Sequence, residues 1–139
     1  RPFLNRRKER KTAREYVDSL KIKTFSELTD AKNLSGGNQQ KVVIAKWLYS
    51  DADVYIFDEP TRGIDVGARD EIYNIMYELI KKKASIIMIS SDLVEVLKMS
   101  DRVAVMGGGE LRAVLDNDGE LTQQDILKIE LAEEVKDEK

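Results

Sequence analysis

The chain of 139 residues contains no cysteine and no histidine, which excludes disulfides, thiolate metal sites and catalysis by an imidazole base. Its 42% of hydrophobic and 35% of charged residues predict one domain with a hydrophobic core. The formal net charge of -3 gives no electrostatic reason to expect a nucleic-acid partner, and no apolar run approaches the ~20 residues of a membrane-spanning helix.

The first part of the chain predicts two long helices with a brief helix between them. Residues 1–14 carry seven basic side chains, and a helix is expected over residues 5–20. Such a run on a helix is more often a solvated face than a phosphate site. Residues 21–33 predict a brief helix and a loop. A second helix is expected after the N-cap residue Ser35, because apolar residues then recur at helical spacing: Val43, Ile44, Trp47 and Leu48.

The start of this second helix predicts an anion site. Gly36 and Gly37 let another group approach the backbone closely. The first turn of a helix also carries unpaired N–H groups and the positive end of the helix dipole, which favour a phosphate. The alternative interpretation is an ordinary capped helix after a glycine-rich turn.

Two adjacent carboxylates end the most apolar stretch of the chain. Residues 54–57 lead directly into Asp58 and Glu59, which predicts a strand buried on both faces whose carboxyl end opens into a ligand crevice. Because side chains alternate along a strand, one carboxylate can hold hydrated Mg²⁺ while its neighbour polarises an attacking water. Pro60 cannot donate to a sheet ladder and ends the strand. An acidic turn after a core strand is the alternative.

The remaining residues continue the alternation of helices and strands. Apolar side chains from Ala68 to Ile80 predict an amphipathic helix, and residues 85–90 predict a second strand, parallel to the first and reached by a right-handed crossover. A helix is expected to begin near Asp92, and two strands around three glycines predict a hairpin over residues 102–115. A final helix is expected near residues 121–131, which gives an α/β fold class.

Three segments together resemble a known family. Residues 34–41 (LSGGNQQK) resemble the signature sequence of ATP-binding-cassette (ABC) ATPases, and residues 54–61 resemble their Walker B strand with its adjacent glutamate. Residues 63–68 fall where that family has its D-loop. The version found here is most similar to the second nucleotide-binding half of bacterial monosaccharide importers of the ribose and galactose type.

The resemblance implies the C-terminal part of a P-loop NTPase domain. Residues 1–33 would belong to the helical subdomain, and residues 34–139 would carry the signature, Walker B, D-loop and switch region. A phosphate loop of the form G-x-x-x-x-G-K-[ST] is not present, since no glycine in the chain precedes a lysine. The isolated chain is therefore expected to bind MgATP very weakly and to be inactive.

For the intact protein, the resemblance implies an ABC-type ATPase that drives sugar import from the cytoplasmic face of the membrane. The implied cofactors are ATP and Mg²⁺. The implied partners are a second nucleotide-binding domain, membrane-embedded permease subunits and, indirectly, a periplasmic or extracellular sugar-binding protein. Since the chain lacks half of the expected sheet, exposed apolar strands are predicted to make it self-associate.

Within the family two such domains pair head to tail, and this arrangement implies the first set of site residues. Ser35, Gly36 and Gly37 would contact the γ-phosphate of ATP that is held by the partner domain. Gln39 would flank that site. Asp65, in the D-loop, would help to couple the two sites across the interface.

A second set of residues would serve the nucleotide site of their own domain. Asp58 would bind Mg²⁺ through water, and Glu59 would polarise the attacking water. The family usually has a histidine after the next strand, and Ser91 occupies that position in this chain. A serine can donate a hydrogen bond to a phosphate but cannot carry a positive charge, so the site would be slow or altered. The alternative is that Ser91 only caps the helix that begins near Asp92.

Two other functions remain open at this point. The first is the C-terminal lobe of a DNA-repair or chromosome-maintenance ATPase, although the long heptad repeats that flank such lobes are not visible here. The second is a non-catalytic regulatory half-site. The missing histidine favours it, and the intact pair of Asp58 and Glu59 argues against it.

Overall fold

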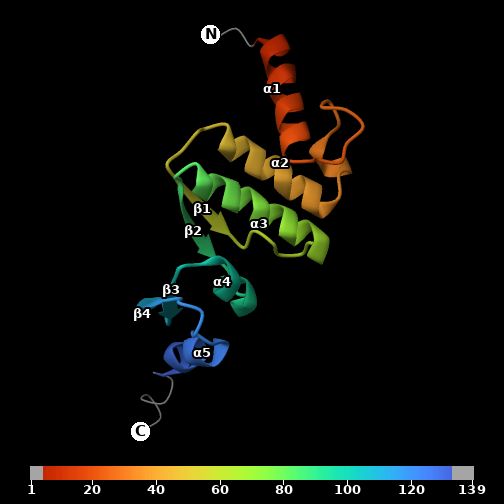
Figure 1. The fold of residues 1–139 in the computed structure, drawn as a ribbon. Helices are drawn as coiled ribbons and strands as arrows, with labels where there is room; N and C mark the ends of the chain where they lie inside the picture. The colour runs from red at the N-terminus through yellow and green to blue at the C-terminus, as the bar shows by residue number, and fades with distance from the viewer. Residues whose placement is uncertain (1–4, 133–139) are drawn as a thin grey trace. The chain divides into compact units, whose positions relative to one another are not determined.

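The structure is a computed structural model that describes residues 5–132. These residues fall into two compact units, one up to residue 87 and one from residue 88 (Figure 1). Helices and strands alternate along both, as the α/β prediction requires. Among residues 5–132, no helix combines the length and the apolar character that crossing a bilayer demands.

Four helical segments form most of the first unit. They are α1 (Arg6–Ser19), the short 3₁₀ helix η1 (Ala31–Asn33), α2 (Gly36–Leu48) and α3 (Val66–Lys81). Asn5 caps α1, because its side-chain oxygen accepts a hydrogen bond from the Lys8 N–H at 3.1 Å. The predicted helices over residues 5–20 and after Ser35 are therefore confirmed, with ends within one or two residues.

Helices α2 and α3 lie side by side and supply the core of the first unit (Figure 1). Ile44 of α2 and Ile72 and Met76 of α3 are almost fully buried. Ile72 and Met76 share one face of α3, because they are four residues apart. Further core residues are Ile22, Tyr55, Tyr73 and Leu79. This packing fixes the start of α2 against the start of α3.

The predicted pair of strands is present. Strand β1 (Val54–Asp58) pairs with β2 (Ser85–Ile89), and Figure 1 draws their arrows in the same direction, with α3 connecting them. The prediction that the first strand is buried on both faces is wrong for this chain. Tyr55 is buried, whereas Val54 and Ile56 on the opposite face are 55% and 67% exposed. The physical reason is that the described residues place no packing layer over that face.

The second unit is built around the predicted hairpin. Strands β3 (Arg102–Gly107) and β4 (Glu110–Asp116) pair antiparallel, and helices α4 (Leu93–Met99) and α5 (Gln123–Leu131) flank them in the chain. Its core consists of Val103, Val105 and Ile126, with half-buried apolar neighbours: Leu93, Val96, Leu97, Leu115, Leu121 and Ile129. The alternation of buried and exposed residues along β3 is what a strand with one covered face requires.

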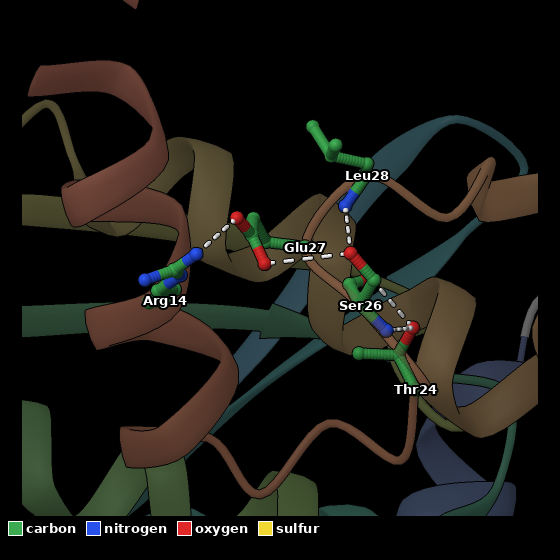
Figure 2. A network of polar contacts seen from close by, with 5 residues as sticks. All are labelled: Arg14, Thr24, Ser26, Glu27 and Leu28. Carbon is green, nitrogen blue, oxygen red and sulfur yellow. Dashed lines mark hydrogen bonds and ion pairs between the residues drawn. The ribbon is translucent and has the colours of Figure 1, made fainter. Parts of the chain in front are cut away.

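A polar network ties the loop after α1 to that helix (Figure 2). Arg14 donates a hydrogen bond from Nη2 to Glu27 Oε1 at 2.9 Å. The Ser26 hydroxyl donates to the other oxygen of Glu27 at 3.4 Å and also accepts from the Leu28 N–H at 3.2 Å. The hydrogen bond from Arg14 is the main reason that the pKa of Glu27 lies below its ordinary value of 4.5.

This lowered pKa makes part of the stability depend on pH. Above pH 4.5, the ordinary pKa of Glu27, the ion pair contributes its full stabilisation, and the contribution is lost as the pH falls through the lower folded-state pKa. Urea unfolding at a series of pH values should therefore show that Glu27→Gln lowers the free energy of unfolding at pH 7 but not at the acidic end. Glu15→Gln, at an ion pair with a distance of 3.8 Å, is the control. Equal effects of Glu27→Gln at all pH values would contradict this.

Candidate functional site

The turn before α2 presents Ser35 at the predicted position. Ser35 is the N-cap residue, with extended backbone angles of φ -62° and ψ 156°, and both Ser35 and Gly36 are exposed. Its hydroxyl makes no capping hydrogen bond to the helix backbone and instead accepts one from the Asn38 side chain at 2.7 Å. The N–H groups of the first helical turn have no partner within the helix, so the turn keeps the anion-binding potential that the sequence predicted.

The two glycines of this turn differ in their surroundings. A Cβ on Gly36 would lie 4.0 Å from the Gly63 carbonyl oxygen and from the Ile64 side chain, which is ordinary contact. A Cβ on the buried Gly37 would lie 2.7 Å from the Cβ of Ala68, which is too close. Residues 34–41 and residues 63–68, two of the segments singled out in the sequence, are thus in contact. Gly37 has a packing function besides any contact with a nucleotide.

Replacing Gly37 with alanine is expected to destabilise the chain by about 1 to 2 kcal/mol. Forcing a methyl group into a tight contact costs roughly 1 to 3 kcal/mol, and the better helix propensity of alanine returns only part of that. Gly36→Ala is the matched control and should be neutral or slightly stabilising. Urea unfolding of the chain measures both. The double variant with Gly37→Ala and Ala68→Gly tests the cause. If its change in the free energy of unfolding equals the sum of the two single changes, the contact with Ala68 is not the cause.

Gln39 points its amide back toward its own segment. Its Nε2 donates to the Leu34 carbonyl oxygen at 2.8 Å, and its backbone N–H donates to the Ser35 carbonyl oxygen at the same distance. The side chain therefore closes the turn from outside. Its predicted place beside a nucleotide stays a prediction.

The two carboxylates lie where β1 ends. Asp58 is the last residue of the strand and is exposed, whereas Glu59 has a left-handed φ of +46°. Such a conformation is uncommon for a residue other than glycine, and Lys21, Asp51 and Lys83 share it. Because the strand ends at Asp58, the alternation of side chains along it does not extend to Glu59. Strand alternation therefore does not explain how the two carboxylates would take different roles. Pro60 and Thr61, both buried, anchor the turn.

Asp58 and Glu59 are the candidate metal ligands of this site. Among residues 5–132, no group of three or more acidic, histidine or cysteine side chains converges on a metal position. Mg²⁺ that arrives with a nucleotide needs only one or two carboxylates, because phosphates and waters complete its shell. Asp58 fits that requirement. It would hold Mg²⁺ through water, and the ion would supply charge neutralisation at the phosphates.

Asp65 caps α3. Its Oδ1 accepts a hydrogen bond from the Ala68 N–H at 3.0 Å. The predicted D-loop residue therefore orders the turn that packs against Gly37, and its part in coupling two sites stays a prediction.

Ser91 lies in the second unit and is exposed. The helix that follows is capped by Asp92, whose Oδ1 accepts from the Val94 and Glu95 N–H groups at 3.1 Å and 3.3 Å. The interpretation that Ser91 caps this helix is therefore wrong, because the next residue occupies the cap. The preceding Ser90 donates from its hydroxyl to the buried Glu95 at 2.5 Å.

Two side chains beside the glycine turn were not singled out from the sequence. Lys41 is only 1% exposed, and its Nζ lies 2.5 Å from Glu71 of α3 and 3.1 Å from the Lys21 carbonyl oxygen. Asn38 accepts the Lys23 N–H at 2.8 Å. A lysine between two glutamines and an apolar run gives no sign of burial. An asparagine three residues after a serine is a detectable pattern, because such residues share a helix face.

Comparison with known proteins finds a matching family model and similar proteins for this chain. The family model described as "ABC transporter" matches residues 3–62. The galactose/methyl galactoside import ATP-binding protein MglA of Clostridium tetani is 48% identical over 90% of this chain, which covers 25% of that protein. The ribose import ATP-binding protein RbsA of Geobacillus kaustophilus is 52% identical over 91% of this chain, again covering 25% of the relative.

Solved structures agree on the fold. A dimeric ABC transporter cassette matches with a TM-score of 0.72 at 22% identity, over 86% of this chain and 51% of that one. Another ABC transporter cassette matches with a TM-score of 0.75 at 24% identity, over 93% of this chain and 52% of that one. The chain thus spans about a quarter of the length of the curated relatives and about half of the solved cassettes.

Proposed function

This chain belongs to the ABC transporter family of ATP-binding proteins, and we propose that it forms the signature and Walker B part of a cassette whose ATP hydrolysis drives import of a sugar. The names of its relatives, which import galactose, ribose and arabinose, favour sugar uptake over the DNA-repair alternative. The intact ATPase would work at the cytoplasmic face of the membrane with permease subunits, and a sugar-binding protein would deliver the substrate.

One observation carries this proposal. The glycine turn that begins with Ser35 is exposed at the start of a 13-residue helix and is packed against residues 63–68. A cassette that closes over nucleotide held by a partner needs this combination, because the turn must face outward while its backbone is fixed from behind. Ser35 and Gly36 would reach the γ-phosphate directly, and Gly37 would contribute its backbone N–H.

The carboxylates would act at the other site, on nucleotide bound by the phosphate loop of their own domain. Asp58 would hold the hydrated Mg²⁺, and Glu59 would accept a proton from the attacking water. Asp65 would connect the two sites through the turn that it caps, and Gln39 would border the signature. The exposed face of β1, with Val54 and Ile56, would be covered by helices from the rest of the domain.

The test is sugar uptake in cells that lack the intact ATPase. We expect uptake of one labelled monosaccharide among ribose, galactose and arabinose to be lost, to be restored by the wild-type protein and not to be restored by Glu59→Gln. Unchanged uptake together with sensitivity to DNA damage would instead favour the DNA-repair alternative.

A further inference from the structure

Both polar atoms of the Asn38 side-chain amide make hydrogen bonds. Its Oδ1 accepts a hydrogen bond from the backbone N–H of Lys23 at 2.8 Å, and its Nδ2 donates to Ser35 Oγ at 2.7 Å. Asn38 is half-buried, while Ser35 is exposed. A backbone group of the loop after α1 therefore sets the orientation of a side chain that touches the candidate site.

The chemistry of these groups fixes the direction of each hydrogen bond. A backbone N–H can only donate, so the Asn38 atom that meets it is the oxygen. The amide nitrogen then faces Ser35, and because this nitrogen can only donate, the Ser35 oxygen must accept. A hydroxyl that accepts from one neighbour keeps its single proton to donate to another.

From this arrangement we infer that Asn38 is a positioning residue, which makes the Ser35 hydroxyl a hydrogen-bond donor toward a fully deprotonated phosphate oxygen. Such an oxygen is an acceptor only, so a serine that spent its proton on a neighbour would present lone pairs to it and repel it. The inference rests on the proposed function, in which Ser35 meets the γ-phosphate of nucleotide on the partner domain.

The substitution Asn38→Asp separates this function from a structural one. The introduced carboxylate would have nearly the same shape as the amide and would still accept the Lys23 N–H. Its second oxygen, however, would accept the Ser35 proton and turn the hydroxyl away from the phosphate. In the intact ATPase, Asn38→Asp should lower kcat/KM for MgATP by at least about tenfold. Removal of one hydrogen-bond donor at a reacting group lowers the rate by about a hundredfold or more. Hydrogen exchange at the Lys23 amide should stay at the wild-type rate, since the introduced carboxylate would still accept that hydrogen bond.

A double-mutant cycle with Ser35→Ala identifies the route of the effect. If Asn38 acts through the Ser35 hydroxyl, Asn38→Asp should have a much smaller effect in the Ser35→Ala background. An equal effect in both backgrounds means that the new carboxylate repels the phosphate directly, and it overturns the inference. So does a kcat/KM like that of the wild type. If Asn38→Asp does not fold, the uncharged Asn38→Ala must show the same coupling to Ser35→Ala.

These outcomes are distinct from failure of the proposed function. A wild-type ATPase that hydrolyses no ATP refutes the proposed function, and the inference falls with it. A wild-type enzyme that hydrolyses ATP and is insensitive to Asn38→Asp refutes only the inference.

Discussion

Glu59→Gln is expected to lower ATP hydrolysis by the intact ATPase by about two to four orders of magnitude, the range that a positioned general base contributes. Glutamine keeps the size and the hydrogen-bonding shape of the side chain but cannot accept the proton of the attacking water. MgATP binding should survive, because the proposal assigns the phosphates and Mg²⁺ to other groups.

Single-turnover hydrolysis and nucleotide binding, measured on the same preparation, test this expectation. Glu78→Gln is a suitable control, since Glu78 is an exposed carboxylate of α3 that pairs with Lys81 at 2.6 Å. If Glu59→Gln retained more than about a tenth of the wild-type rate, the loss would be too small for removal of a general base. The general base would then have to be another group.

Ser91→His is expected to raise ATP hydrolysis by the intact ATPase by about a hundredfold, the value of one well-placed donor at developing charge. An imidazole can donate a hydrogen bond and carry the positive charge that serine lacks. The measurement is single-turnover hydrolysis with the other composite site disabled, for Ser91, Ser91→His and Ser91→Ala.

The structure supplies a sharp control for this experiment. Asp92, rather than Ser91, caps α4, so Asp92→Ala should lower stability by about 1 kcal/mol. Asp92→Ala should leave the rate nearly unchanged, which separates a loss of helix stability from a change in chemistry. A histidine variant with the rate of the wild type would show that Ser91 does not occupy the switch position.

Local patterns in the sequence predicted most of the elements. The serine, the two glycines and the apolar spacing that follows located α2, and the glycines between two apolar runs located the hairpin. These features depend on neighbours within a few residues, where backbone sterics and capping decide the structure.

The failures of prediction all involve groups that are distant in sequence or choices between adjacent residues. An apolar run predicted burial of both faces of β1, but burial depends on which layer packs there, and the described residues cover one face. The contact of Gly37 with Ala68 and the pairing of Lys41 with Glu71 depend on how α2 packs against α3. At the start of α4 the sequence offered two good N-cap residues, Ser91 and Asp92, and the backbone shows that Asp92, the one expected to pair with Glu95, is the cap.

The central claim is that the turn over residues 34–40 acts on nucleotide held by a different domain. Amide hydrogen exchange of this turn, measured in the intact ATPase with Glu59→Gln and with or without MgATP, tests it most directly. We predict that MgATP slows exchange, and that this protection is lost when the phosphate-loop lysine of the partner domain is replaced but kept when that of the chain's own domain is replaced. Protection that depends on the chain's own domain, or no protection at all, would contradict the account.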